Sequence, residues 1–240
     1  MEVIPAVDLM GGKVVRLSRG EPDTAKGYEG LEDPLWVARK WEREGARYLH
    51  VVDLDAATGR DNNRQTISTI IRGVVIPVQV GGGIRSRAVV EEMLNLGAGR
   101  VIVATLAFER EDMLKTLVDG FGRDRIMVAL DYLNGIVMTR GWKGSTGITL
   151  EAAVEKFLKL GVELFLLTSI SRDGLLVGPD YITLKTMVKR FKRGLFVAGG
   201  INALDDLVKL KAIGVDGVVV GKALYEGRFG LKEALESVRG

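Results

Sequence analysis

The sequence of 240 residues contains no cysteine, which excludes disulfide bonds and thiolate metal sites. No apolar run is long enough to cross a membrane. The N-terminus also lacks a basic segment followed by an apolar one, so we expect no secretion signal. These absences favour a cytoplasmic protein that does not bind membranes.

A strong charge of one sign is missing as well. Lys and Arg total 34 and Asp and Glu total 31, so the net charge is +3. No basic stripe is interleaved with aromatic residues, so we expect no nucleic-acid partner, and the mild positive balance suits a phosphorylated small molecule. Asn and Gln total only seven while 27% of the residues are charged, a composition typical of a thermophile.

One stretch of the sequence occurs twice, offset by 117 residues, so that Gly82 corresponds to Gly199. Each copy reads as a strand, a glycine turn, a helix, a second glycine turn and another strand. A Gly-Gly turn after a strand leaves backbone N–H groups bare, and these can close on a phosphate at the start of the next helix. Two such turns indicate two phosphate sites and therefore a bisphosphate ligand. The alternative is that the glycines only make tight turns.

The whole chain divides into eight strand–helix units. Strands are expected at residues 2–8, 48–54, 75–80, 101–104, 126–131, 164–169, 195–198 and 218–221. Helices are expected at about 34–45, 63–72, 87–96, 111–121, from 149, at 182–191, after the second glycine turn, and at 231–238. Hairpins are expected at 13–17 and 134–135, and a short extra turn at 222–227. The strands are apolar and β-branched, which predicts a parallel sheet buried on both faces.

The length fits a single (β/α)8 barrel, here with a half-barrel internal duplication and one domain over residues 1–240. We expect bulky apolar side chains to fill the inside of this barrel. The residues assigned to that filling are Ile4, Val52, Val78, Val103, Val128, Leu166, Val197 and Val219.

Barrel enzymes carry their chemistry at the C-terminal ends of the strands. The polar residues at those positions are Asp8, Asp53, Gln79, Thr105, Asp131, Thr168 and Ser169. Asp8 ends the first strand and Asp131 the fifth, so the two face each other across an eight-stranded ring. Facing carboxyl groups with a phosphate site on each side suit proton transfer at the middle of a bisphosphate, one as base and the other as acid. Alternatively, strand-end aspartates cap helices, which stays open for Asp53.

Two further residues attract attention. His50 lies three residues before Asp53, so strand alternation points the two to opposite faces. We expect Asp53 at the mouth and His50 against the surrounding helices, in a structural role. Trp142 lies in the glycine-rich loop after the fifth strand, where it could cover a substrate as a lid or anchor the loop.

These residues give the chain a resemblance, over its whole length, to the histidine-biosynthesis isomerases that act on phosphoribosyl-formimino-aminoimidazole carboxamide ribotide (ProFAR). The motifs are IPAVDL at 4–9, GKVVR at 12–16, HVVDLD at 50–55, QVGGGIR at 79–85, RGW at 140–142 and AGGI at 198–201. The resemblance implies a half-barrel duplication and an Amadori rearrangement of an aminoaldose to an aminoketose. It also implies that no metal or organic cofactor takes part.

The resemblance further implies roles for particular residues. Asp8 would be the base that removes the C2′ proton, Asp131 the acid that opens the ribose ring, and Thr168 a hydrogen-bonding partner near the reacting centre. Phosphate contacts would come from Gly82, Gly83, Arg85 and Thr105 at one end, and from Gly174, Gly178, Gly200 and Gly221 at the other. We also expect Asp53, Gln79 and Trp142 to contact the substrate, and the protein to be a monomer.

Three alternatives remain. Ser169 and Leu175 depart from the isomerase pattern, and Thr-Ser followed by Arg-Asp-Gly resembles the cyclase subunit of imidazole glycerol phosphate synthase. The first strand argues against this sister enzyme, which has Pro-Cys-Leu-Asp there and a Lys where this chain has Arg16. Activity on phosphoribosylanthranilate as well is a second alternative. A non-enzymatic phosphate-ligand binding barrel, the third, would leave the paired aspartates unexplained.

Overall fold

The computed structural model of the chain describes residues 1–18, 20–192 and 194–239. In this part eight parallel strands close into a barrel, since β7 and β10 pair directly and β12 pairs with β1. In order around the barrel the strands are β1 (Glu2–Met10), β4 (Leu49–Asp53), β5 (Val78–Gly81), β6 (Arg100–Val103), β7 (Ile126–Leu133), β10 (Leu164–Ser169), β11 (Leu195–Ala198) and β12 (Gly217–Val220). The predicted (β/α)8 barrel is confirmed.

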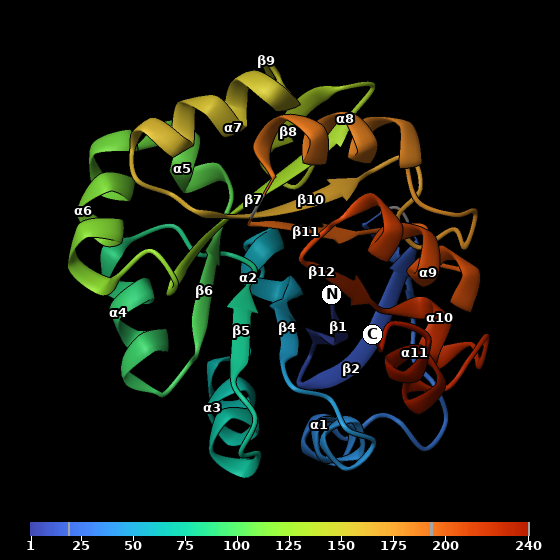
Figure 1. Cartoon of the computed structure of the whole chain (residues 1–240). Coiled ribbons are helices and arrows are strands. Elements are labelled where there is room, and N and C mark those ends of the chain that lie inside the picture. Colours follow the sequence, from blue (N-terminus) through green and yellow to red (C-terminus); the bar gives the residue numbers. More distant parts are fainter. Residues whose placement is uncertain (19, 193, 240) are drawn as a thin grey trace.

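The helices surround the strands on the outside, except for α2, which is drawn near the middle of the view (Figure 1). They are α1 (Pro34–Arg43), α2 (Leu54–Thr58), α3 (Arg64–Gly73), α4 (Arg87–Asn95), α5 (Thr105–Glu109), α6 (Glu111–Phe121), α7 (Leu150–Lys159), α8 (Tyr181–Phe191), α9 (Leu204–Ile213), α10 (Lys222–Tyr225) and α11 (Leu231–Ser237). The first helix begins where its sequence predicts, because the Asp33 carboxylate accepts a hydrogen bond from the Trp36 N–H at 2.8 Å. No helix of the described residues is long and apolar enough to span a membrane.

Two long loops leave the C-terminal ends of β1 and β7. Loop A (residues 11–33) contains β2 (Lys13–Ser18) and β3 (Glu21–Lys26), and loop B (residues 134–148) contains β8 (Ile136–Thr139) and the start of β9 (Gly144–Thr149). Loop B begins with a tight turn, as predicted, in which Asn134 and Gly135 have φ angles of 50° and 79°. Both loops therefore start from strands that carry a predicted catalytic aspartate.

The duplication is visible in the element boundaries. The strands β5 and β11, the helices α4 and α9, and the strands β6 and β12 each begin 117 residues apart. The short helices α5 and α10 keep the same offset. The two halves of the barrel are therefore equivalent in structure over the stretch that repeats in sequence.

The core has two layers. The larger one lies between strands and helices, where Trp41 and Phe157 are fully buried. The inner one fills the barrel and consists of Ile4, Ala6, Ile102, Met127, Leu166, Phe196 and Val219. The prediction was wrong for Val78, Val103, Val128 and Val197, which pack in the outer layer. Strands buried on both faces carry apolar residues on each face, so the period-2 alternation gave no signal there.

Part of the barrel interior is polar. The His50 Nδ1 atom is 2.9 Å from Nε2 of Gln79, and Oε1 of Gln79 accepts a hydrogen bond from Arg100 at 3.0 Å. The Arg100 guanidinium lies 5.0 Å from the ring centre of Tyr48 and 5.1 Å from that of Phe196. These groups fill the N-terminal end of the barrel.

The orientation predicted for His50 was wrong. His50 is the register partner of Ala6, an inner-layer residue, and it is 7% exposed. Asp53 instead pairs with Leu9 of the outer layer. The two side chains do point to opposite faces, but the faces are exchanged. Burial lowers the pKa of His50 to about 4, so the ring is neutral at physiological pH.

Candidate active site

Asp8 lies at the C-terminal end of β1 and is joined to a buried cation. The Arg16 guanidinium, on β2, donates to Oδ2 of Asp8 at 2.5 Å and also to the carbonyl oxygen of Ala6. Arg16 is 5% exposed and stacks 4.4 Å from the ring centre of Tyr225. Loop A therefore folds back to place a fixed positive charge beside the first predicted catalytic carboxylate.

Asp131 lies on β7, four strands away from β1 around the ring in either direction. Its Oδ2 atom accepts a hydrogen bond from the Trp142 indole N–H of loop B at 2.8 Å, and its register partner on β10 is Thr168. Burial raises the pKa of Asp131, while hydrogen bonds from Trp142 and Thr168 oppose the shift. The structure thus brings these three predicted site residues together.

A third carboxyl group belongs to this end of the barrel. Asp173 follows β10 and is half-buried, and its backbone lies against the turn at Gly199. Burial raises the pKa of Asp173 to about 7, followed by the negative charges of Asp8 and Asp131. Asp173 is therefore protonated in a large fraction of molecules near neutral pH.

The two repeated glycine turns have similar backbone conformations. The equivalent residues Gly82 and Gly199 have φ angles of 93° and 90°, and Gly200 has a φ angle of 84°. A Cβ atom at Gly82 would lie 2.3 Å from the carbonyl oxygen of Asp53, and one at Gly200 would lie 2.4 Å from that of Gly178. The fold therefore requires glycine at both positions, whatever ligand they bind, and substitution there would disturb folding as well as binding.

The backbone around both turns is open to a ligand. Outside the strand ladders, the described residues provide no hydrogen-bond acceptor for the N–H groups of Gly82, Gly83 and Gly200. At the first turn, Thr105 begins α5, and the exposed Arg85 side chain donates to the carbonyl oxygen of Ala57 at 2.9 Å. These bare donors satisfy the requirement for an anion site that the sequence predicted.

The glycines predicted for the second phosphate gather at the second turn. The Gly178 N–H donates to the carbonyl oxygen of Gly200 at 2.8 Å, and Gly221 immediately precedes α10. The Gly174 carbonyl oxygen accepts a hydrogen bond from the Lys222 ammonium at 2.8 Å. The second turn thus has a cationic side chain beside it.

Two residues predicted to contact substrate are occupied by protein partners. Asp53 is 3% exposed, and its carboxylate accepts hydrogen bonds from the Ala56 N–H and from both the N–H and the side-chain amide of Asn63. Gln79 is fully buried in the barrel interior between His50 and Arg100. The capping role that the sequence left open for Asp53 is the one its hydrogen bonds show, so we assign neither residue to the substrate.

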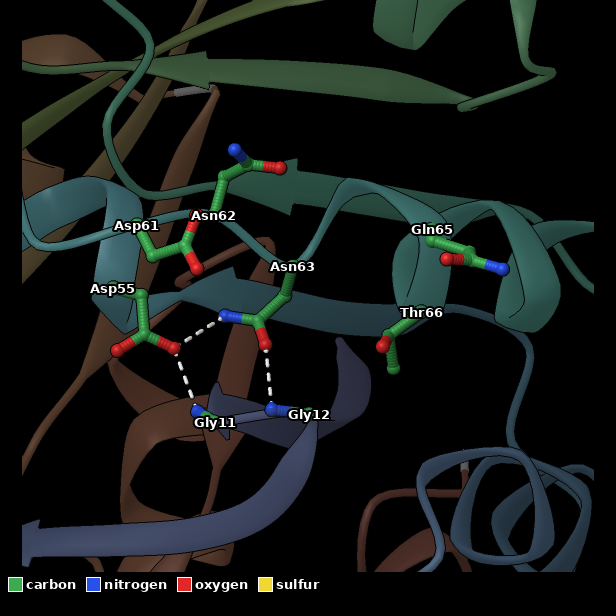
Figure 2. Close-up of a pocket in the computed structure, with 8 residues that line it drawn as sticks. All are labelled: Gly11, Gly12, Asp55, Asp61, Asn62, Asn63, Gln65 and Thr66. Atoms are coloured by element: carbon green, nitrogen blue, oxygen red, sulfur yellow. Dashed lines mark hydrogen bonds between the residues drawn. The ribbon is translucent and has the colours of Figure 1, made fainter.

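A polar cavity of about 290 Å³ lies beside the hydrogen bonds between Asp53 and Asn63 (Figure 2). Asp8, Asp131 and Asp173 do not line it. Figure 2 shows Asn63 reaching across it: its side chain donates to Asp55 at 2.9 Å and accepts from the Gly12 N–H at 2.8 Å. The Gly11 N–H donates to Asp55 at 2.7 Å. The lining contains carboxylates and amides but no basic side chain, so it does not suit a phosphate. Its hydrogen bonds fix the start of loop A.

Sequence reasoning gave no site role to Arg16, Asp173 and Lys222. Arg16 lies in the GKVVR motif and Asp173 in the Arg-Asp-Gly segment, but neither residue is at the C-terminal end of a barrel strand. Lys222 follows the repeat directly. All three residues lie in the segments that follow the barrel strands, and these segments carry much of the chemistry of such barrels.

Comparisons with known proteins show the family of the chain. Residues 2–230 match the family model described as histidine biosynthesis protein. A protein of Halothermothrix orenii named 1-(5-phosphoribosyl)-5-((5-phosphoribosylamino)methylideneamino)imidazole-4-carboxamide isomerase is 42% identical over 233 residues, which cover 97% of this chain and 98% of the relative. A protein of the same name from Methanothermococcus thermolithotrophicus is 41% identical over 240 residues and covers 100% of both chains. The chain therefore belongs to the histidine biosynthesis protein family.

Proposed function

We propose that this protein is a ProFAR isomerase, which converts the aminoaldose ribotide to its aminoketose in histidine biosynthesis by an Amadori rearrangement. The observation that carries the proposal is the placement of Asp8 and Asp131 at the ends of opposite barrel strands, with an open glycine turn in each half of the barrel. The relatives described above bear the name of this isomerase.

In the proposed mechanism Asp131 is the acid. Its raised pKa lets it hold a proton, which it gives to the ring oxygen so that the ribose ring opens. Asp8 is the base and removes the C2′ proton, while Arg16 supplies the fixed positive charge that its carboxylate needs. C1′ then gains a proton and the C2′ hydroxyl becomes a carbonyl, so the reaction consumes no oxidant or reductant. Thr168 and Trp142 orient the Asp131 carboxyl group.

We assign two accessory roles. Asp173 keeps one proton in the site near neutral pH, because its pKa is about 7. The two glycine turns bind the two phosphates of the substrate, with Arg85 and Thr105 at the first and Gly174, Gly178 and Gly221 at the second. Phosphate binding at both ends would hold the reacting carbons between the aspartates, which lowers the entropic part of the barrier.

The barrel interior supports the isomerase over the cyclase. A cyclase needs ammonia from a glutaminase partner, and the barrel axis is its usual path. Here Arg100 lies between Tyr48 and Phe196 at the N-terminal end and is hydrogen-bonded to Gln79, so that path is filled by protein.

One assay tests the proposal. The purified protein should convert ProFAR on its own, and the ketose mixed with ammonium salts should remain unchanged. Consumption of the ketose only with ammonium would establish the cyclase, whereas binding of ProFAR without turnover would establish a ligand-binding barrel. A parallel reaction with phosphoribosylanthranilate measures whether a second substrate is accepted.

Finer features of the proposal have separate tests. We propose a monomer that acts in the cytoplasm without a metal or organic cofactor. Sedimentation, cell fractionation and an assay after dialysis against a chelator would check these three points. We also propose a thermophilic source, for which the unfolding midpoint should exceed the roughly 45–65 °C typical of mesophilic domains.

A further inference from the structure

The short helices α5 and α10 occupy equivalent places in the two halves of the barrel. They follow the fourth and eighth barrel strands, and Thr105 and Glu109 correspond to Lys222 and Glu226 at the 117-residue offset. Neither glutamate is near the catalytic carboxyl groups in sequence, and the proposed mechanism uses neither. Their contacts nevertheless follow one pattern.

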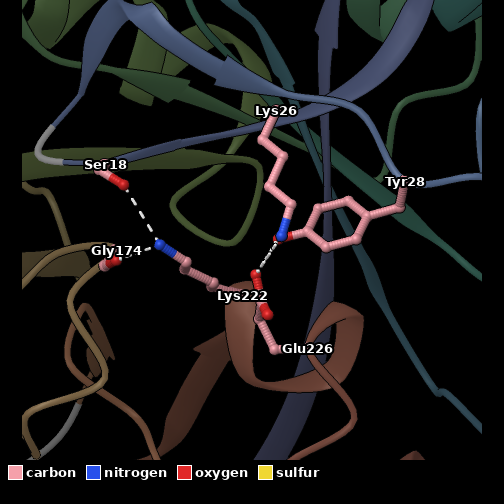
Figure 3. A network of polar contacts seen from close by, with 6 residues as sticks. All are labelled: Ser18, Lys26, Tyr28, Gly174, Lys222 and Glu226. Atoms are coloured by element: carbon pink, nitrogen blue, oxygen red, sulfur yellow. Dashed lines mark hydrogen bonds and ion pairs between the residues drawn. The ribbon is translucent and has the colours of Figure 1, made fainter.

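The second-half helix holds loop A (Figure 3). Oε1 of Glu226 accepts hydrogen bonds from the Tyr28 hydroxyl at 2.6 Å and from the Lys26 ammonium at 3.1 Å. At the other end of α10, the Lys222 ammonium donates to Oγ of Ser18 at 3.2 Å. The hydrogen bonds from Tyr28 and then Lys26 lower the pKa of Glu226, so this carboxylate stays charged through neutral pH.

The first-half helix holds loop B with the equivalent residues. Oε1 of Glu109 accepts from Nε and Nη2 of Arg140 at 3.1 Å and 2.9 Å. Oγ1 of Thr105 accepts from the Arg140 backbone N–H at 3.0 Å. In each half, therefore, the first residue of the short helix and the glutamate four residues later both form hydrogen bonds with one long loop. That loop is loop B for α5 and loop A for α10.

The gripped loops carry groups that contact the catalytic aspartates. Loop A carries Arg16, which is bound to Asp8, and loop B carries Trp142, which is bound to Asp131. The loops also meet each other, since a Cβ atom at Gly20 would lie 2.5 Å from the Trp142 ring. Each short helix thus grips a loop that begins in the other half of the barrel.

We propose that Glu109 and Glu226 are a matched pair of positioning residues, which clasp loops B and A closed and thereby hold Trp142 and Arg16 against the catalytic aspartates. The kinetic part of this inference rests on the proposed isomerase function, whereas the structural part does not.

Each clasp is exposed to solvent, so its contribution is modest. Exposed ion pairs shift equilibria by a factor of about two to five. If substrate binds the closed loops, a smaller closed fraction raises the apparent KM by at most that factor and leaves the turnover of bound substrate unchanged. We therefore expect Glu109→Ala and Glu226→Ala each to raise the KM for ProFAR by up to about fivefold, with kcat within about twofold of the parent.

Hydrogen–deuterium exchange of the same proteins reads the loops directly. Glu226→Ala should speed exchange most in residues 20–28, and Glu109→Ala most in residues 136–146. Glu163→Ala is the matched control, because it removes an exposed carboxylate bound to Arg123 at 2.8 Å, next to the N-terminal ends of β7 and β10. It should change neither loop and leave KM unchanged. Should the protein lack isomerase activity, the exchange pattern would still decide whether the clasps exist in solution.

A second pair of variants separates the clasp from a general loss of structure. Tyr28→Phe removes one hydrogen bond to Glu226, so it should give part of the effect alone and none in addition to Glu226→Ala. Additive effects, unchanged loop exchange in both glutamate variants, or faster exchange with an unchanged KM would each overturn the positioning role.

Discussion

The carboxyl groups of Asp8, Asp131 and Asp173 share one end of the barrel, yet they differ in their partners. Asp8 is bound to the Arg16 guanidinium, whereas the indole N–H of Trp142, a neutral donor, is bound to Asp131. Burial raises the pKa of Asp131 and of Asp173. The partners of the carboxyl groups therefore differ, a cation at Asp8 and a neutral donor at Asp131, as the base and acid roles proposed for them require.

Asp8→Asn tests the base. An amide cannot accept the C2′ proton, so we expect kcat to fall by about 10²–10⁴ and KM to change little. Steady-state kinetics give both numbers. The circular dichroism spectrum should match the parent, because the amide oxygen can still accept from Arg16. A kcat near that of the parent protein would remove Asp8 from the mechanism.

Asp173→Asn tests the raised pKa through stability. The folded protein binds the Asp173 proton more tightly than the unfolded chain, since the pKa is about 7 instead of the ordinary 3.8. Stability from this proton is therefore complete below about pH 4 and is lost as the pH rises toward 7. Urea denaturation should show the variant to be more stable than the parent at pH 8, by a margin that shrinks at pH 5. Equal margins at both pH values would contradict the raised pKa.

The positions of residues at strand ends could be predicted from the sequence. The face of the barrel to which a side chain within a strand points could not. Asp8 and Asp131 could be paired across the barrel because eight strands place the first and fifth opposite each other. The side of the barrel that His50 faces could not be derived, since β4 is buried on both faces and its alternation fits either assignment. The hydrogen bonds that the Asp53 carboxylate makes within the protein could not be derived for the same reason.

At the scale of elements, loops A and B act as one unit because Trp142 packs on Gly20. Gly20→Val should push the loops apart, since the added Cβ would overlap the indole ring. We expect a several-fold rise in KM with little change in the unfolding midpoint, because the contact lies outside the barrel core. Gly30→Val in the same loop is the control, because Gly30 also has a positive φ angle, 76°, and no atom lies within 4 Å of a Cβ there. Equal kinetics in the two variants would contradict the contact.

Most regular elements were predicted closely, while the short ones were missed. The strands at 164–169 and 195–198 and the helix at 111–121 have their predicted bounds. The five-residue helices α2 and α5 were not predicted, because one turn shows too little periodicity to be recognised. The clasps depend on α5 and α10, and the sequence indicated only the second of these, as a short turn at 222–227, so the contact between α5 and loop B could not be derived from it.

At the scale of the whole molecule, the duplication was readable in the sequence because no gap interrupts it. The apolar filling of the barrel was predicted only in part. Polar side chains of His50, Gln79 and Arg100 replace it at one end of the barrel. They can be buried there because each one forms a hydrogen bond with its neighbour.

Arg100→Met tests that chain. It would leave the Gln79 carbonyl oxygen buried without a donor, which costs about 1–3 kcal/mol. Urea denaturation should show this loss in the free energy of unfolding, while Arg123→Met on the surface should be within about 0.5 kcal/mol of the parent. A fully stable Arg100→Met protein would mean that water or a neighbouring group replaces the guanidinium.

The contact between loops A and B also affects which step limits the rate of the reaction. If the contact between Trp142 and Gly20 covers a bound ligand, that ligand can leave only after the loops separate. Loop movements of this kind take microseconds to milliseconds, whereas typical enzymes complete about 1–10³ turnovers per second. Two clasps, each contributing about 0.2–1 kcal/mol, would open and close many times within one catalytic cycle. Proton transfer rather than release should then limit the rate, and kcat should be insensitive to the viscosity of the solvent.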